Sequence, residues 1–410
     1  MKNNMQTLKL TKKYEKYPEY KDSGVEWLGM IPKGWDIVSS RQLFTTTKER
    51  VGSNFADHKI LSLTLHGVVP KNLDGSGKNP AEYDTYQEFK KDDLVFCLFD
   101  YDVTPRTIGY VEEDGMMTGA YTRLIPQNGV HSKYFYYYFL VLDHRKELLH
   151  LCTGLRNSLS KPVFWSMKSS LPHFTEQQRI TKYLDEKIAL IDQIIEKKEK
   201  QIELLKEKKV SFINDLVNNT KGFEEKLKYI APEKNIKVES LPPETIYIGM
   251  ENIESGTGRY TPSIENLSPE SVANIFSGGD VLFGKLRPYL AKVYSPDFNG
   301  VCSGEFLVLK PRKNKVSSKF LFYKLISKDF IKKVDDSTYG TKMPRANWQF
   351  IGNQFITYPD ILKQNEIVEE LDNKTKLYEE VINDVAKSIE VLKEFKTSLI
   401  SNVVTGKIKV

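Results

Sequence analysis

The chain has 410 residues, of which 40% are hydrophobic and 11% aromatic, so it is long enough for two globular domains that each bury a core. No apolar run approaches the roughly 18 residues of a membrane span, the N-terminus lacks the apolar core of an export signal, and the three cysteines show neither a disulfide framework nor metal-ligand spacing. These features exclude a membrane protein and a disulfide-rich secreted protein, and they predict a soluble protein of the reducing cytoplasm. The net charge of +6 indicates no partner by itself.

The first half of the chain predicts a globular region of short strands and one helix. Apolar runs at 58–65, 93–100 and 120–126 favour strands, and a helix is expected at about 132–150. The aromatic run FYYYF at 135–139 lies inside that helix. At helical spacing it predicts core packing and subunit contact rather than a stacking platform.

A long helix is predicted next, from Thr175 to Asn219, with Thr175 and Gln178 forming a capping box. Its apolar residues recur at alternating spacings of four and three, which is typical of the seam of a coiled coil. The seam positions are Leu184, Ile188, Ile191, Ile195, Lys198, Ile202, Leu205, Lys209, Phe212 and Leu216.

The second half repeats this order. Strands are expected at 245–251, 280–286 and 305–311, a helix at about 317–335, and a second long helix capped by Asp360. The seam of that helix, each position 187 residues after its counterpart, is Leu371, Thr375, Tyr378, Ile382, Val385, Ile389, Leu392, Lys396, Leu399 and Val403. Asn219 and Gly406 stand at equivalent helix ends, and both residue types tolerate the left-handed conformation that closes a helix.

The repeat is a duplication of about 187 residues. Residues 202–217 and 389–404 share nine identities in 16, and DLVF at 93–96 has its counterpart in DVLF at 280–283. If the two long helices pair, they run antiparallel, because the first leads into the second domain and the second leads back. The alternative is two separate amphipathic helices, each packed on its own domain.

The predicted fold class is therefore α+β: two globular mixed α/β domains joined by two long antiparallel coiled-coil helices, with an internal pseudo-two-fold repeat. The predicted segments are an N-terminal tail (1–20), a first domain (21–172), a first spacer helix (173–220), a second domain (221–359), and a second spacer helix with a C-terminal tail (360–410).

Sequence signatures of catalysis are missing. GSGKNP at 75–80 resembles a phosphate-binding loop but lacks its first glycine and the Ser or Thr after the lysine. EFK at 88–90 is a fragment of the kind found in nucleases, and matches of three residues occur by chance. The six histidines show no ligand pair apart from chance spacings. We expect a protein that is not an enzyme, without a metal or cofactor of its own.

Basic and aromatic loops predict nucleic acid as the partner. The window 281–345 holds 14 Lys and Arg against five Asp and Glu, whereas 90–165 holds nine of each. Arginine, lysine and asparagine bind base edges and phosphates, although a solvated surface explains any one of these loops. The side chains expected to contact DNA are Arg106, Thr153, Arg156, Asn157, Ser160, Lys161, Lys285, Arg287, Tyr289, Lys292, Tyr339, Thr341, Lys342, Arg345 and Asn347.

The chain resembles the DNA-specificity subunits of type I restriction-modification systems over roughly residues 18–410. The features that carry the resemblance are the opening segment 20–44, the link at 171–192 with its echo at 358–374, the loop KLRPYLAK, and the ending SLISNVVTGKI. The resemblance implies two target-recognition domains, each reading half of a bipartite double-stranded DNA sequence, and two helices that set the spacer and dock two methyltransferase subunits. It also implies that S-adenosylmethionine, ATP and Mg belong to partner subunits, including restriction and translocase subunits.

Two other classes of function stay open at this point. One is a structural adaptor whose coiled coil joins two protein-binding heads. The other is an enzyme with an unrecognised site in the first domain. Salt-dependent DNA binding distinguishes the adaptor from a DNA reader, and activity of the purified chain alone would identify the enzyme.

Overall fold

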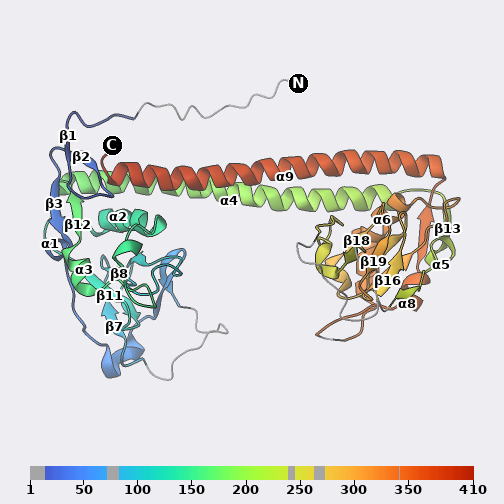
Figure 1. The fold of residues 1–410 in the computed structure, drawn as a ribbon, viewed down its shortest axis with the longest axis horizontal. Coiled ribbons are helices and arrows are strands. Elements are labelled where there is room, and N and C mark those ends of the chain that lie inside the picture. Colours follow the sequence, from blue (N-terminus) through green and yellow to red (C-terminus); the bar gives the residue numbers. More distant parts are fainter. Residues whose placement is uncertain (1–13, 72–82, 239–244, 263–272, 341) are drawn as a thin grey trace. The chain divides into compact units, whose positions relative to one another are not determined.

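The computed structural model describes residues 14–71, 83–238, 245–262, 273–340 and 342–410 (Figure 1). The chain divides into two compact units: unit 1 comprises Met1–Glu196 and Ile389–Val410, and unit 2 comprises Lys197–Ser388. Each unit contains a globular part and segments of two long helices, α4 (Phe174–Asn218) and α9 (Ile361–Val404). The loop at 75–80 lies outside the described residues.

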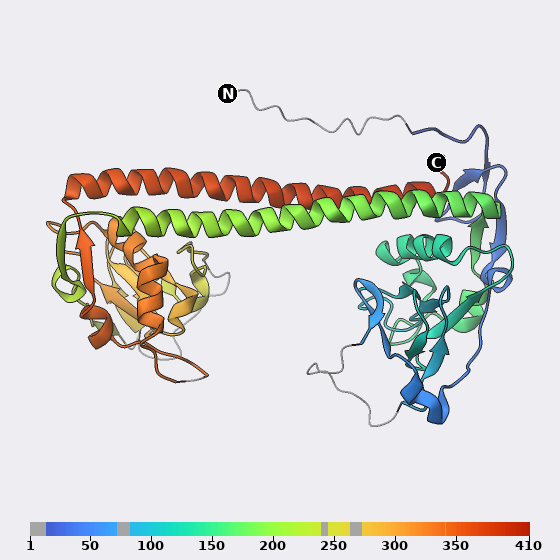
Figure 2. The ribbon, with the colours of Figure 1, turned by 180° about the vertical axis from the view of Figure 1, so that it is seen from behind.

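The segments of α4 and α9 lie side by side within each unit (Figures 1 and 2). Unit 1 packs the start of α4 against the end of α9, with Leu184 and Val403 in one core. Unit 2 packs the end of α4 against the start of α9, with Val217 and Leu371 in one core. The helices therefore run antiparallel. Every predicted seam residue is buried or half-buried, which confirms the predicted coiled-coil seam.

The two seam lysines have equivalent partners. Lys209 Nζ lies 2.7 Å from a carboxylate oxygen of Glu379 in unit 2, and Lys396 Nζ lies 2.7 Å from both carboxylate oxygens of Asp192 in unit 1. The repeat of 187 residues relates Lys209 to Lys396 and Asp192 to Glu379, so one ion pair occurs twice. Polar pairs in an apolar seam favour one register over its alternatives, since a shifted helix leaves a charge unpaired.

The helix ends follow the predictions in part. The Asp360 carboxylate accepts from the Lys363 backbone amide at 2.9 Å, which confirms it as the cap of α9. The predicted cap at Thr175 is wrong, because α4 already begins at Phe174 and the first amides donate to the His173 carbonyl. Gly406 adopts the left-handed conformation with φ of 74°, whereas Asn219 has no positive φ.

Short antiparallel strands build the globular part of unit 1. Its largest sheet has the order β4-β11-β8-β9, from Phe44–Thr45, Thr122–Pro126, Leu94–Phe96 and Ile108–Tyr110. The two-stranded pairs are β1 (Tyr20–Asp22) with β2 (Met30–Pro32), β3 (Asp36–Ser39) with β12 (Lys168–Leu171), β5 (Leu61–Thr64) with β6 (Gly67–Pro70), and β7 (Gln87–Phe89) with β10 (Gly115–Met117).

The helices of unit 1 complete one apolar core with α4 and α9. They are α1 (Ser40–Leu43), α2 (Ser132–His144) and α3 (Lys161–Ser166), with 3-10 turns at Gly52–Asp57 and Leu149–Leu151. The aromatic run of α2 lies in this core, where Phe135 and Phe139 are fully buried. The prediction that this run packs inside the protein is confirmed.

Among the residues that the structure describes, unit 1 has one sheet of more than two strands, whereas unit 2 has two such sheets. One has the order β18-β17-β20, from Val293–Tyr294, Val281–Gly284 and Phe306–Leu309; the other has the order β14-β16-β19-β15, from Lys237–Val238, Ala273–Phe276, Gly300–Cys302 and Tyr247–Ile248. A further pair joins β13 (Phe223–Lys226) and β21 (Phe355–Tyr358). The helices are α5 (Leu227–Ile230), α6 (Ser318–Ile326), α7 (Lys328–Asp335) and α8 (Trp348–Gly352), with 3-10 turns at Met250–Asn252 and Pro288–Leu290.

The helix expected at 317–335 is broken in two. Ser327 stands between α6 and α7 with an extended backbone, and its hydroxyl donates to the Lys324 carbonyl. A serine side chain that bonds the nearby backbone competes with helix continuation, which explains the break.

The repeat extends from sequence to hydrogen bonds. Gln177 accepts from the His131 amide at 2.8 Å and donates to the carbonyls of Gly129 and Pro172. Gln364, 187 residues later, accepts from the Ser317 amide and donates to Lys315 and Pro359 in the same way. Strand pairs β3–β12 and β13–β21 also have matching registers. Each long helix is thus fastened to its own globular part by one buried glutamine.

Gln177→Ala should lower the free energy of unfolding of unit 1 by about 1–3 kcal/mol, because it leaves one amide and two carbonyls without their buried partner. Urea denaturation monitored by tryptophan fluorescence measures this loss. The neighbouring exposed residue supplies the control: Gln178→Ala should leave the midpoint unchanged. Equal midpoints for the two variants would contradict the assigned role.

Candidate nucleic-acid interface

The predicted DNA contacts lie on four loops, at about 100–107, 153–165, 284–292 and 339–348, and these loops come together as two pairs, one in each unit. In unit 1 the Asp100 amide donates to the Arg156 carbonyl at 2.7 Å and the Tyr101 amide to the Asn157 carbonyl at 3.3 Å. We call residues 99–105 and 153–161 the paired loops of unit 1. The segments 285–292 and 339–347 are the paired loops of unit 2, where the Arg287 amide donates to the Pro344 carbonyl at 2.8 Å.

The paired loops share an unusual backbone conformation. Asp100 and Arg287, which the repeat relates, both have φ of 50°, in the left-handed region. Residues other than glycine rarely adopt this conformation, and it occurs mostly where surrounding contacts enforce it at functional sites. Here the loop-to-loop hydrogen bonds supply that enforcement in both units.

Arg156 presents its guanidinium at the surface of unit 1. Its Nε donates to Asp100 Oδ1 at 2.8 Å, its Nη2 bonds the other carboxylate oxygen, and the group lies 4.9 Å from the Phe99 ring centroid. The side chain is still 65% exposed. Hydrogen bonding to Arg156 lowers the pKa of the Asp100 carboxyl. A held arginine with donors left over can recognise a base edge or phosphate with little loss of side-chain freedom.

The other predicted residues of the loop at 153–161 lie at the surface. Thr153 and Ser158 bridge its base, Ser160 and Lys161 are exposed, and Leu155 at its tip is fully exposed. Leu155 was not among the predicted contacts. An apolar side chain at the tip of a recognition loop suits a thymine methyl group, so its position between Gly154 and Arg156 could have indicated it.

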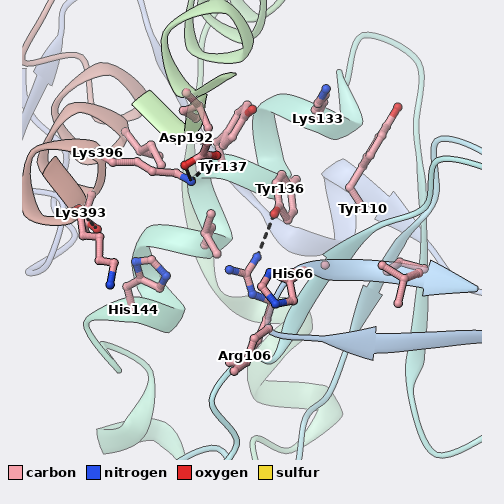
Figure 3. A pocket seen from close by; sticks show the side chains of 18 of the residues that line it. His66, Arg106, Tyr110, Lys133, Tyr136, Tyr137, His144, Asp192, Lys393 and Lys396 are labelled. Carbon is pink, nitrogen blue, oxygen red and sulfur yellow. Dashed lines mark hydrogen bonds and ion pairs between the residues drawn. The ribbon is translucent and has the colours of Figure 1, made fainter. Parts of the chain in front are cut away.

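Arg106 does not belong with the paired loops. Its Nη1 donates to the Tyr136 hydroxyl at 2.9 Å, and its side chain lines a cavity formed with α2, α4 and α9 (Figure 3). The sequence predicted it as a DNA contact together with Arg156, because both lie on basic loops of the first domain. The structure directs it to a different part of unit 1.

In unit 2, Arg345 resembles Arg156. Its Nε and Nη2 lie 3.2 and 2.9 Å from the two carboxylate oxygens of Glu305, and 40% of its side chain is exposed. Lys342, Tyr289 and Tyr339 are exposed around it. Arg287 is half-buried, with its Nη2 3.5 Å from the Lys342 carbonyl. Thr341 lies outside the described residues.

Three predicted contacts have structural partners. Lys292 Nζ donates to the Met250 carbonyl at 2.5 Å, and Asn347 Oδ1 accepts from the Phe350 amide as the cap of α8. Lys285 is half-buried and its carbonyl accepts from the Ala346 amide. Of these three bonds, only the Lys285–Ala346 bond joins the two loops. Sequence alone cannot distinguish a side chain bonded inside the protein from one presented to a partner.

Other kinds of site were sought in the described part of the chain. No group of three or more His, Cys, Asp or Glu residues there could hold a metal ion. Among its helices, none is both long and apolar enough to cross a membrane. The cysteines are free thiols, and burial raises the pKa of each, so they are poor nucleophiles.

Comparison with known proteins gives the family. The model of the type I restriction modification DNA specificity domain matches residues 79–204 and 206–390. The chain belongs to this family. The MjaVIII specificity subunit of Methanocaldococcus jannaschii, a type I restriction enzyme subunit, is 23% identical over 93% of this chain and 94% of its own length.

Two further comparisons agree. The specificity subunit of the type I restriction enzyme EcoDI from Escherichia coli is 24% identical over 40% of this chain, and the match spans only 37% of that subunit. A chain from a solved structure concerned with complex assembly and conformational transition of the type I R-M system superposes with a TM-score of 0.70 at 13% identity, covering 91% of this chain and 98% of that one. At that identity the likeness shows the fold, which is the predicted one.

Proposed function

We propose that this chain is the DNA-reading subunit of a type I restriction-modification complex, with the paired loops of each unit reading one half of a bipartite duplex sequence. The observation that carries the proposal is that the paired loops of each unit present one exposed, carboxylate-bound guanidinium, Arg156 in unit 1 and Arg345 in unit 2. Each is held against a carboxylate, Asp100 or Glu305, beside a backbone turn that the repeat has preserved. Two similar pairs of loops with different amino-acid sequences are suited to bind two different half-sites of DNA.

The chemistry of the paired loops fits duplex DNA. Guanidinium groups match the acceptors of guanine in the major groove, whereas lysines such as Lys161 and Lys342 serve phosphates. Tyr289 and Tyr339 add exposed hydroxyl donors beside Arg345. The excess of basic residues around the paired loops of unit 2 favours that half for the stronger electrostatic contact.

The long helices offer a repeated surface for partner subunits. Leu190 in α4 and Leu377 in α9 are equivalent under the repeat, and 52% of each is exposed. Leu204 and Val391 form a second equivalent exposed pair. Unit 1 therefore carries Leu190 with Val391, and unit 2 carries Leu377 with Leu204. Equivalent apolar surfaces on a repeated chain suit two copies of one partner, which we propose are methyltransferase subunits.

In this proposal the chain supplies recognition and no catalytic step. S-adenosylmethionine, ATP and Mg would be bound by the methyltransferase, restriction and translocase subunits. The residues of this chain position those subunits on DNA through the paired loops and the long helices.

Arg287→Ala combined with Lys342→Ala should weaken DNA binding by about tenfold or more, and should lower the slope of log K against log salt by up to about two. Both changes remove cations from the paired loops of unit 2 without touching its core. Fluorescence anisotropy with a target duplex at several salt concentrations measures affinity and slope together.

A matched control removes the same charge elsewhere. Arg312 and Lys313 are exposed and follow β20 at the end opposite to the paired loops, since Leu309 pairs with Val281 and Phe306 with Gly284. Their double alanine variant should keep its sequence preference. If both double variants lose affinity equally for target and random DNA, the loops do not read sequence. Absence of salt-dependent DNA binding by the assembled complex would instead favour the protein adaptor.

A further inference from the structure

Unit 1 contains a cavity of about 720 Å³ between its globular part and the two long helices (Figure 3). The turn between β5 and β6 forms one wall, α2 another, and the segments of α4 and α9 that belong to unit 1 close the third. This volume is in the range of cavities that hold a small organic ligand. The cavity lies apart from the paired loops of unit 1.

Basic side chains gather on one side of the cavity. Lys393, Lys396 and His144 lie near one another in Figure 3, and Arg106 points toward the same space from the strand side. The pKa of His144 is lowered by desolvation and by the charges of Arg106 and Lys396, so these groups are close enough to repel one another. Such a cluster is stabilised when an anion enters it.

Arg106 has donors to spare. Its Nη1 bonds the Tyr136 hydroxyl, and within the described residues no carboxylate forms an ion pair with it. Lys396 is half-buried in the seam and paired with Asp192, which also lines the cavity. Lys393 is exposed and paired with Glu390 on its own helix. A guanidinium held by a neutral hydroxyl in a cavity is placed to bind a ligand oxygen.

In unit 2, the space equivalent to this cavity has different lining residues and is occupied by a loop. Val293 pairs with Phe283 as Ile108 pairs with Phe96, so the position equivalent to Arg106 is Ala291, and the position equivalent to Tyr136 is Phe322. The loop at 254–260 fills the space: a Cβ on Gly258 would lie 2.4 Å from the Phe322 ring, and Arg259 donates to Glu379 at 3.1 Å. Unit 2 therefore replaces the basic cavity with its own chain, and the fold of the repeat does not require the cavity.

Aromatic rings lie beside Arg106, on the side away from Lys393 and Lys396 (Figure 3). Tyr110 and Tyr136 have ring centroids 6.3 Å apart, and Val68 of the β5–β6 pair also lines the cavity. One side thus suits a charged group and the other a planar or apolar group. This division matches a phosphorylated molecule with a ring system.

We infer that the cavity of unit 1 binds a phosphorylated ligand of nucleotide size, with its phosphate against Arg106, Lys393 and Lys396 and its ring system beside Tyr110 and Tyr136. The phosphate has two possible sources, a free nucleotide or the backbone of the bound duplex. Only the second source depends on the proposed function.

The test uses the full-length protein without DNA and titrates ATP, AMP and inorganic phosphate by calorimetry. We expect ATP to bind, and Arg106→Ala to weaken that binding by about tenfold or more, since hydrogen bonds to a charged group are lost. Lys393→Ala changes an exposed residue and should weaken binding without a folding defect. Lys387→Ala, on an exposed face of α9 away from the cavity, is the control and should bind as the wild type does.

The arms separate the two sources. If ATP or phosphate binds the wild type, and the Arg106 and Lys393 variants bind it more weakly, the site belongs to a free ligand. No binding of either, with a salt slope for duplex DNA that falls by about one in Arg106→Ala, assigns the phosphate to DNA. If no probe binds and the salt slope is unchanged, the inference is wrong. DNA binding by the wild type reports on the proposed function separately.

Discussion

Replacing residues 227–354 by the corresponding segment of another family member will change one half of the recognised DNA sequence and leave the other half unchanged. The replaced segment carries the paired loops of unit 2. It leaves β13 and β21 in place, and these strands pair with Lys226 opposite Phe355, so the segment begins and ends at adjoining residues. A new segment can therefore enter without moving the long helices.

The equivalent replacement in unit 1 is the matched control. Residues 40–167 lie between β3 and β12, where Ser39 pairs with Lys168 in the same register. That chimera should change the other half-site. Sequencing of methylated sites, with methyltransferase subunits present, measures both halves at once. A chimera in which both halves change together would contradict independent reading by two units.

Inserting seven residues after Ile195 in α4 and seven after Ile382 in α9 should lengthen the preferred gap between half-sites. Both helices begin in one unit and end in the other, and a whole heptad keeps the apolar seam in phase. The pairs of Asp192 with Lys396 and Lys209 with Glu379 can both re-form, because each shifts by the same number of residues. Seven residues add about 10 Å of helix, which is about three base pairs.

Binding to a library of duplexes with different gap lengths measures this shift. Three extra base pairs also rotate one half-site by about 100°, so the absolute affinity should fall while the preferred gap increases. A control insertion of two residues at the same places turns the following apolar residues by about 200° out of the seam and should prevent stable assembly. A heptad variant that assembles and still prefers the original gap would show that the helices do not set the spacing.

The helix pair was predictable because its signal is periodic. The seam of alternating apolar residues fixed both helices, and the repeated lysines in it are explained by equivalent carboxylates on the facing helix. Such a signal depends only on residues a few positions apart. By contrast, the break at Ser327 depends on a competing side-chain bond, and the apolar residues on both sides continue the helical pattern.

The candidate site was predictable as a set of loops and not as a set of contacts. Residue type and the repeat indicated four loops, two in each domain, and their pairing by backbone hydrogen bonds became visible only in the structure. Lys292 donates to the Met250 carbonyl, and Asn347 accepts from the Phe350 amide. Only the structure shows that the Lys292 ammonium group already has a partner inside the protein. Arg106 and Arg156 lie on different loops, and the sequence does not show that the first bonds Tyr136 while the second bonds Asp100.

The most direct measurement of the central claim is sequencing of the duplexes that the chain, assembled with its methyltransferase subunits, selects from a random library. The account predicts two short conserved blocks separated by a gap of fixed length and no sequence preference. It also predicts that alanine at Arg345 relaxes one block while alanine at Arg156 relaxes the other. A single continuous block, or no enrichment at any salt concentration, would contradict it.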